Sequence, residues 1–120
     1  MSGPLFHIEI VTPVKRIYAG EVGAVTLPGV EGEMCILAHH APMLAMLQPG
    51  IMSYEDERGR HVWAVDRGFV QLSEKQVVIV LSQAWRQEDL PEELTPPPAG
   101  SLADSRESLL YRAQMQLKGA

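Results

Sequence analysis

Residues 27–50 read LPGVEGEMCILAHHAPMLAMLQPG, and this stretch decides the fold and holds the candidate functional residues. Glycines and prolines separate its short apolar runs, and Pro28-Gly29 and Pro49-Gly50 are dipeptides typical of turns. Glu33 and the pair His39-His40 are therefore expected at the edges of loops held by a rigid frame. Binding residues are concentrated at such positions.

The sequence around this stretch predicts short β-strands. Apolar and polar residues alternate over residues 6–10, which is the period-two pattern of a half-buried strand. Further strands are expected over 22–27 (ending at Pro28-Gly29), over 43–47, over 51–57 and 60–66 as a hairpin around Arg58-Gly59, and over 69–72 and 77–81. The pattern predicts a mainly β protein, a β-sandwich or flattened barrel of about ten short strands.

The last third of the chain is expected to be a linker followed by one short α-helix. Residues 88–93 are mostly acidic, and the three consecutive prolines at 96–98 exclude a helix because they lack backbone donors. A helix is expected over 101–118, starting at a capping-box-like Ser101–Asp104. Its stripe is Leu102, Arg106, Leu109, Ala113 and Leu117.

So short a helix is unstable alone, so it either packs on the sandwich or frays. The predicted units are a β-sandwich over 1–86, an acidic and proline-rich linker over 87–100, and the helix over 101–120.

Composition limits the classes of partner and compartment. The formal charge of −5 argues against nucleic acid as the main partner, because phosphate binding needs a basic stripe. A single cysteine excludes an intramolecular disulfide and fits a reducing compartment. Residues 1–20 lack the apolar segment of a signal peptide, and no apolar run reaches the roughly 20 residues of a spanning helix. We therefore expect a soluble, cytoplasmic chain without direct membrane insertion.

Motifs for chemistry are weak. His39 and His40 point to opposite faces of an extended chain, so with Cys35 and Glu33 they make a poor metal site. A Cys35–His40 dyad lacks an orienting acid, and Cys35 resembles a small core residue. The segment from Gly29 to Gly32 lacks the lysine and helix of a phosphate cradle. We expect no catalytic residues, no metal and no cofactor.

Four methionines gather near this region, and two interpretations stay open for them. They are Met34, Met43, Met46 and Met52. Methionine fills irregular cores, and it is also common at adaptable protein interfaces.

Six ordered segments within about the first ninety residues resemble the epsilon subunit of F-type ATP synthases, the equivalent of the mitochondrial delta subunit. They are FHIEIVTP at 6–13, IYAGEV at 17–22, LPGVEGEM at 27–34, HAPML at 40–44, PGI at 49–51, and RGFV at 67–70 before QVVIVL. Cys35, His39 and Arg67 stand where the family usually has glycine. These departures bear on local turn geometry.

The resemblance implies a β-sandwich in the central stalk, clamped between the gamma subunit and the membrane c-ring during proton-driven ATP synthesis. It implies that His40, Met43 and Leu44 contact gamma and that Glu31 and Glu33 contact the c-ring loops. Glu31 fits a solvated turn charge equally well. The subunit would be non-catalytic and peripheral, on the cytoplasmic face of the bacterial inner membrane.

Two other functions stay open. One is an epsilon-like subunit of a sodium-translocating or auxiliary rotary ATPase. The other is a stand-alone β-sandwich that binds a small ligand. Copurification with a rotary complex discriminates between them, because only the rotary functions require it.

Relatives in this family end in a two-helix hairpin that can inhibit ATP hydrolysis, and some bind ATP there through an I/L-D-x-x-R-A-like motif. The strings around Arg106 and Arg112 lack that spacing, so no nucleotide site is expected. Residues 90–100 contain four prolines and cannot form the first helix. We therefore expect a poor conformational inhibitor. The alternative left open is that the linker delivers the helix to the alpha and beta subunits.

Overall fold

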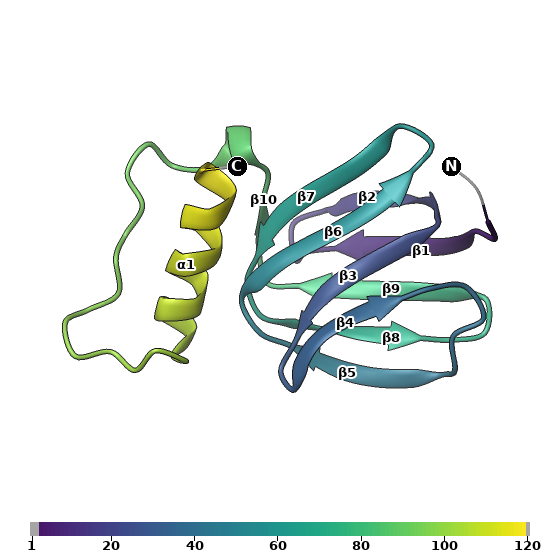
Figure 1. Cartoon of the computed structure of the whole chain (residues 1–120), viewed down its shortest axis with the longest axis horizontal. Coiled ribbons are helices and arrows are strands. Elements are labelled where there is room, and N and C mark those ends of the chain that lie inside the picture. Colours follow the sequence, from purple (N-terminus) through teal and green to yellow (C-terminus); the bar gives the residue numbers. More distant parts are fainter. Residues whose placement is uncertain (1–2, 120) are drawn as a thin grey trace.

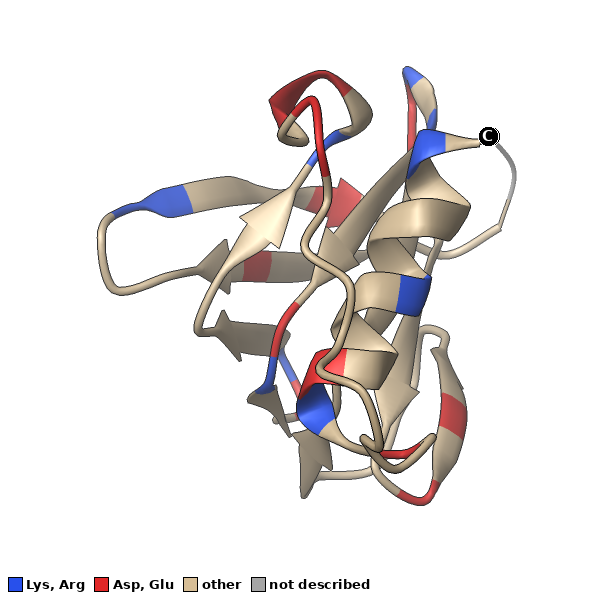
Figure 2. Ribbon diagram, turned by 90° about the vertical axis from the view of Figure 1, so that its left-hand side faces the viewer, with Lys and Arg blue, Asp and Glu red and all other residues tan. Residues whose placement is uncertain are grey.

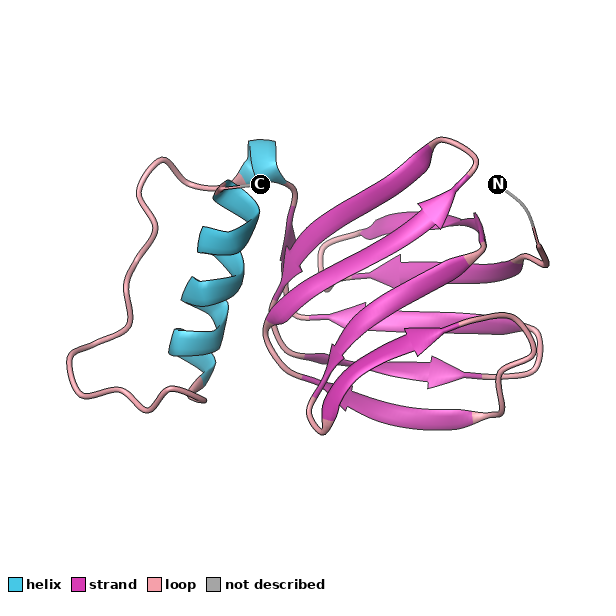
Figure 3. Cartoon of the chain, viewed as in Figure 1, coloured by secondary structure: helices cyan, strands magenta, loops and turns pink. Residues whose placement is uncertain are grey.

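The computed structural model describes residues 3–119, which form ten strands, one 3-10 turn and one α-helix (Figures 1 and 3). The elements are β1 Phe6–Val11, β2 Arg16–Val22, β3 Ala24–Gly29, β4 Gly32–Ile36, β5 Met43–Leu47, β6 Gly50–Asp56, β7 Gly59–Val65, β8 Gly68–Leu72, β9 Gln76–Leu81, β10 Ala84–Trp85, the 3-10 turn Gln87–Asp89 and α1 Arg106–Lys118. The mainly β class predicted from sequence is confirmed.

The strands form one curled sheet whose two halves face each other (Figure 1). The order is β10-β7-β6-β3-β5-β8-β9-β1-β2, with β4 paired to β3 beside this path. Neighbours are antiparallel except β1 and β9, which are parallel. The halves meet where β5 bends into β6, and there the Gln48 N–H donates to the Pro28 carbonyl at 2.9 Å.

The core fills the space between the two halves. One face of each long strand is buried, as the period-two pattern predicts, and Ile8, Val25, Val70 and Ile79 have no exposed surface. Burying side chains of this size stabilises the fold by about 1.5–3 kcal/mol each. The curled sheet is therefore a packed sandwich with little compliance.

Several strand boundaries differ from the predictions by one residue, at β6, β7, β8 and β9, and the region around β3 differs more. The predicted single strand over 22–27 is wrong, because the chain changes partner at Gly23, leaving β1 and joining β6. The turn predicted at Pro28-Gly29 is also wrong, since both residues belong to β3 and the turn is Val30-Glu31. Pro28 fits the strand because its carbonyl, and not its missing N–H, makes the bond towards Gln48.

The helix begins later than predicted. Its first residue is Arg106, and the hydroxyl of the N-cap Ser105 accepts from the Ser108 N–H at 3.2 Å. The hydroxyl of Ser101 instead donates to the Pro98 carbonyl at 2.6 Å, so it is unavailable as a cap. Leu102 is 73% exposed and does not belong to the packed stripe.

The helix docks on the outer face of the sheet, over β6 and β7 (Figure 1). Ala113 and Leu117 are buried against Ala64, with Ile51 and Val62 beside them. Of the two outcomes expected for this helix, packing is the one observed.

The segment between β10 and α1 contains the 3-10 turn and then an irregular loop that projects away from the sheet (Figure 3). The beginning of this segment is tied to the end of α1: Lys118 Nζ donates to the Glu92 carbonyl at 2.9 Å, and Gln87 Nε2 donates to the Lys118 carbonyl at 3.3 Å. The division into 1–86, 87–100 and 101–120 stays a prediction, and Met1, Ser2 and Ala120 lie outside the described residues.

Candidate functional site

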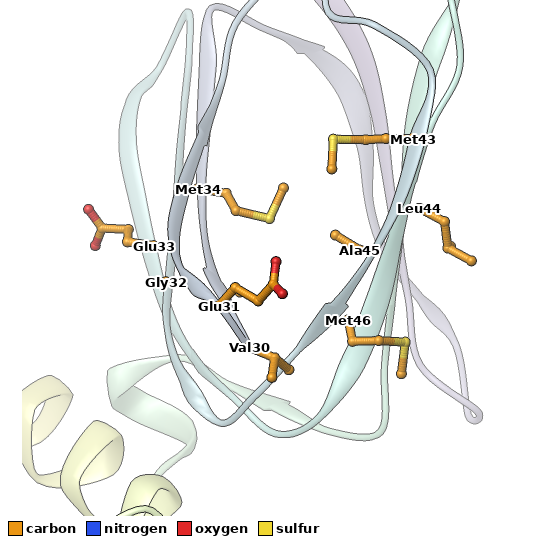
Figure 4. Close-up of a pocket in the computed structure, with 10 residues that line it drawn as sticks. Val30, Glu31, Gly32, Glu33, Met34, Met43, Leu44, Ala45 and Met46 are labelled. Carbon is orange, nitrogen blue, oxygen red and sulfur yellow. The ribbon is translucent and has the colours of Figure 1, made fainter.

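A groove opens between β4 and β5, where the halves of the sheet diverge (Figure 4). Its volume is about 530 Å³, and its walls are two short segments, residues 29–34 and residues 43–46. The groove therefore lies within the stretch that the sequence singles out.

The β3–β4 hairpin is fixed at its tip. The Val30 N–H donates to the Met46 carbonyl at 3.0 Å, which ties the tip to β5. A Cβ at Gly29 would meet the Gly32 carbonyl oxygen at 2.6 Å, and Gly32 itself has φ +136°. Glycine is thus required at both positions for this tight turn.

The groove has an apolar floor and an acidic rim. The side chains of Met34, Met43 and Ala45 point into it, together with Glu31 (Figure 4). Glu33 points away from the groove, on the outer side of β4. This combination suits a protein partner with apolar and basic side chains.

The outer face of β5 continues the apolar surface. Leu44 and Met46 point outward there, and they are 64% and 60% exposed. Val30 at the hairpin tip and Leu37 after β4 are also more than half exposed. A cluster of exposed large apolar residues is typical of an interaction surface.

The structure brings four of the five predicted contact residues to this groove. All four belong to its walls: the side chains of Glu31 and Met43 point into it, and those of Glu33 and Leu44 point outward. The two sets predicted for different partners are therefore neighbours. Sequence reasoning missed Val30, whose only signal is an apolar residue at a turn.

His40 is separate from the groove and braces the loop before β5. Its Nδ1 lies 3.1 Å from the Leu37 carbonyl oxygen, and its Nε2 lies 2.7 Å from that of Ser73. The ring packs edge-on against Phe6, at 5.4 Å between centroids. Both ring nitrogens are thus engaged within the chain.

The residues at the family's glycine positions have distinct environments. His39 has φ 66°, so the left-handed backbone favoured by glycine is retained there. The Arg67 N–H donates to the Asp66 carboxylate at 2.7 Å. Cys35, expected in the core, is exposed instead, because β4 is an edge strand with one open face.

The two interpretations of the methionines apply to different residues. Met52 is fully buried in the core, whereas Met43 is 49% exposed at the groove. In residues 3–119 no group of three His, Cys, Asp or Glu side chains could hold a metal ion. No described helix is long and apolar enough to cross a membrane. Lys and Arg residues are scattered among acids over several elements (Figure 2).

The opposite seam of the sandwich, between β2 and β6, is closed by polar side chains. Asp56 accepts from the Tyr18 hydroxyl at 3.1 Å, from His61 Nε2 at 2.9 Å and from the Arg58 N–H at 2.8 Å. The hydrogen bond from His61 holds the pKa of Asp56 below its usual value. Burial and the hydrogen bond to Asp56 raise the pKa of Tyr18 to about 12.

This seam also carries a column of stacked rings. The ring centroids of Tyr18 and Tyr54 lie 4.4 Å apart, and the Tyr54 ring stacks on the His61 ring with 5.0 Å between centroids. One seam is thus closed by side chains, whereas the groove between β4 and β5 stays open.

The curled, packed sheet with a groove between β4 and β5 defines a β-sandwich domain. Residues 5–87 match the family model described as the ATP synthase, Delta/Epsilon chain, beta-sandwich domain. This match covers well over half of the 120 residues, and the chain belongs to that family. The resemblance found in the sequence is confirmed.

Individual relatives agree with this assignment. An ATP synthase epsilon chain of Campylobacter concisus is 40% identical over 79 residues, which are 65% of this chain and 61% of the relative. An ATP synthase epsilon chain of Dehalococcoides mccartyi is 31% identical and is matched over 94% of this chain and 90% of its own length. The match thus spans 61% of the length of each of the two Campylobacter relatives.

A solved structure shares the fold. A chain in the mitochondrial ATP synthase of Euglena gracilis, solved with OSCP, F1 and the c-ring in rotational state 1, has a TM-score of 0.67 and 25% identity. The superposition covers 76% of this chain and 66% of that one.

Proposed function

We propose that this chain is a central-stalk subunit of an F-type ATP synthase, non-catalytic itself, which couples the gamma subunit to the c-ring loops. Family membership supports this function, and so does the shared fold with a chain of a complex that contains F1 and the c-ring. The observation that carries it is the groove, where exposed apolar residues adjoin an acidic hairpin tip.

The groove suggests how two partners share one edge of the domain. Met43 and Leu44 on β5 offer apolar area to gamma, and burial of such anchors carries most of the affinity of an interface. Glu31 at the hairpin tip and Glu33 on β4 offer charge to the c-ring loops, which mainly sets orientation and association rate. His40 supports gamma docking by holding the loop that leads into β5.

The hairpin tip and β5 form one mechanical unit. The bond from Val30 to Met46 joins the acidic tip to the apolar strand, and the packed core lies behind both. A load applied at one partner therefore reaches the other with little deformation, because packed interiors are stiff. Coupling of this kind needs no active site.

The proposal places the chain on the cytoplasmic face of a bacterial inner membrane, held there by its partners. The coupled ion in this proposal is a proton. The alternative function is that of the same subunit in a sodium-translocating rotary ATPase. Ion selectivity would lie in the c-ring in either case.

Copurification from membranes tests the proposal. The tagged chain is expected to bring down gamma, the c-ring and the catalytic subunits. Met43→Asp places a charge in the groove, and Leu44→Asp places one on the outer face of β5. Each is expected to weaken binding to gamma at least tenfold, about 1.4 kcal/mol. Leu102→Asp is the matched control, because Leu102 is an exposed leucine far along the chain from the groove. Recovery of no rotary subunit by the unmodified chain would contradict the proposed function.

A further inference from the structure

We propose that the free edge of β4 accepts an extended segment of the gamma subunit as an added β-strand, with alternate side chains of that segment entering the groove. This inference rests on the proposed function and specifies how the partner is held. It differs from docking onto a flat apolar face, because main-chain hydrogen bonds would supply part of the affinity.

The geometry of the β3–β4 hairpin shows which backbone groups of β4 are free. Gly29 and Gly32 flank a two-residue turn, so they form a hydrogen-bonded pair, and the pairs alternate from there. Glu33 and Cys35 consequently direct their N–H and C=O groups away from β3. The Pro28 carbonyl, opposite Glu33, bonds to Gln48 on the side away from β4, as this alternation requires.

Within residues 3–119, β3 is the one strand that pairs with β4. The outward edge of β4 faces the groove and β5 across it (Figure 4). An edge with free donors and acceptors beside an apolar trough is the arrangement that strand addition uses.

The other edges of the sheet are protected, and that of β4 is less so. β2 is paired through an irregular register at Ile10/Val11 and begins with Arg16 after Lys15. β10 has two residues and leads into the 3-10 turn. β4 pairs with β3 without a register shift and contains no proline or lysine. Bulges, lysines and shortness are the usual devices that prevent strand addition.

The surroundings of the edge specify the segment. Met34 and Met43 in the groove favour apolar residues at every second position, because strand side chains alternate. Glu31, whose side chain points into the groove, favours Lys or Arg at one flank of the segment. A helix in the same place would leave the outward amides of β4 without protein partners, so an extended segment fits better.

A proline substitution separates the backbone from the side chain. Cys35→Pro removes an outward N–H, and proline is tolerated on an edge strand when the lost donor faces solvent. We expect Cys35→Pro to fold and to bind gamma at least tenfold more weakly, because one main-chain hydrogen bond to the added strand is lost. Cys35→Ala is the matched control: it removes the thiol, keeps the N–H and is expected to bind like the unmodified chain.

Amide hydrogen exchange of the full-length chain, with and without purified gamma, gives a reading that needs no substitution. Binding is expected to slow exchange at Glu33 and Cys35, while Met34 is protected already because its N–H pairs with β3. Gamma binding with these two amides still exchanging freely would overturn strand addition and leave the proposed function standing.

The remaining outcomes are also decisive. Failure of the unmodified chain to bind gamma overturns both proposals. Protection of Glu33 and Cys35 that appears without gamma and grows with chain concentration would mean that a second copy of this chain occupies the edge, and would overturn the assignment to gamma.

Discussion

Arg106, the first residue of α1, donates two hydrogen bonds to the carboxylate of Asp66, which follows β7 and is 2% exposed. This pair ties the start of the helix to the sheet, while Ala113 and Leu117 hold its later turns. The hydrogen bond with Asp66 raises the pKa of Arg106, so the guanidinium is charged throughout the accessible pH range. The ion pair and the apolar contacts thus hold different parts of the helix on the sheet.

Arg106→Ala is predicted to destabilise the chain by about 1–3 kcal/mol, because it leaves a buried carboxylate without its main partner. Urea unfolding measures this. The double variant Asp66→Asn with Arg106→Gln removes both charges and should recover part of the loss. Equal stability of Arg106→Ala and the unmodified chain would mean that the ion pair does not hold the helix.

Tyr18 predicts an alkaline transition. Its pKa in the folded chain is about 12, above the ordinary 10.0, so the folded state binds this proton more tightly than the unfolded state does. The stabilisation is therefore complete below about pH 10 and is lost as the pH rises towards about 12. Thermal melting from pH 9 upwards should show a decline in Tm that is smaller in Tyr18→Phe. A decline of the same size in both chains would assign it to another group.

A substitution of His40 is predicted to destabilise the isolated chain, before any partner is bound. His40→Glu replaces the ring by a carboxylate beside the carbonyl oxygens of Leu37 and Ser73, so both exposed contacts are lost. A loss of about 0.5–1.5 kcal/mol in the isolated chain is expected. His40→Gln keeps a donor and should lose less. If His40→Glu melts like the unmodified chain but still weakens gamma binding, the ring acts in the interface itself.

Deletion of residues 95–120 is predicted to change ATP hydrolysis by the purified complex only modestly. Residues 90–105 contain no α-helix, so the described chain lacks the first helix of the hairpin that inhibits in relatives. The deletion also uncovers Ala64 and Asp66, so its folding must be checked by melting. A several-fold rise in hydrolysis by a folded variant would show that this tail inhibits.

Strands such as β1 could be predicted from the sequence because they bury a single face. Phe6, Ile8 and Ile10 are all buried, and their alternation with polar residues is visible without any structure. A hairpin was predictable in this region as well, but its turn is Glu57-Arg58, and β6 and β7 each begin and end one residue earlier than predicted.

The predictions of the turn at Pro28-Gly29 and of the start of the helix were wrong, because contacts distant in sequence decide the structure at both places. Proline is typical of turns, but it is tolerated in a strand at a position where no neighbouring strand needs its missing N–H, and Pro28 occupies such a position. Ser101 and Ser105 are both suitable caps, and the contact between Arg106 and Asp66, forty residues apart in sequence, favours the second.

The candidate site was predictable in its residues but not in its shape. Glu31, Glu33, Met43 and Leu44 stand within one short stretch, whereas their meeting at one groove depends on how the sheet curls to bring β4 opposite β5. Pairing order is a long-range property that spacing along the chain does not reveal. The contact of His40 with Ser73 is of the same kind.

The hydrogen bonds that join the segment after β10 to the end of α1 have a kinetic consequence. Lys118 and Gln87 close a loop whose other end is held by Arg106 on Asp66, so no single hinge can swing the helix outward. Release of α1 would be a local unfolding event in which these contacts are lost together. Amides throughout α1 should then exchange with one common opening free energy, and they should do so more slowly than those of the proline-rich loop.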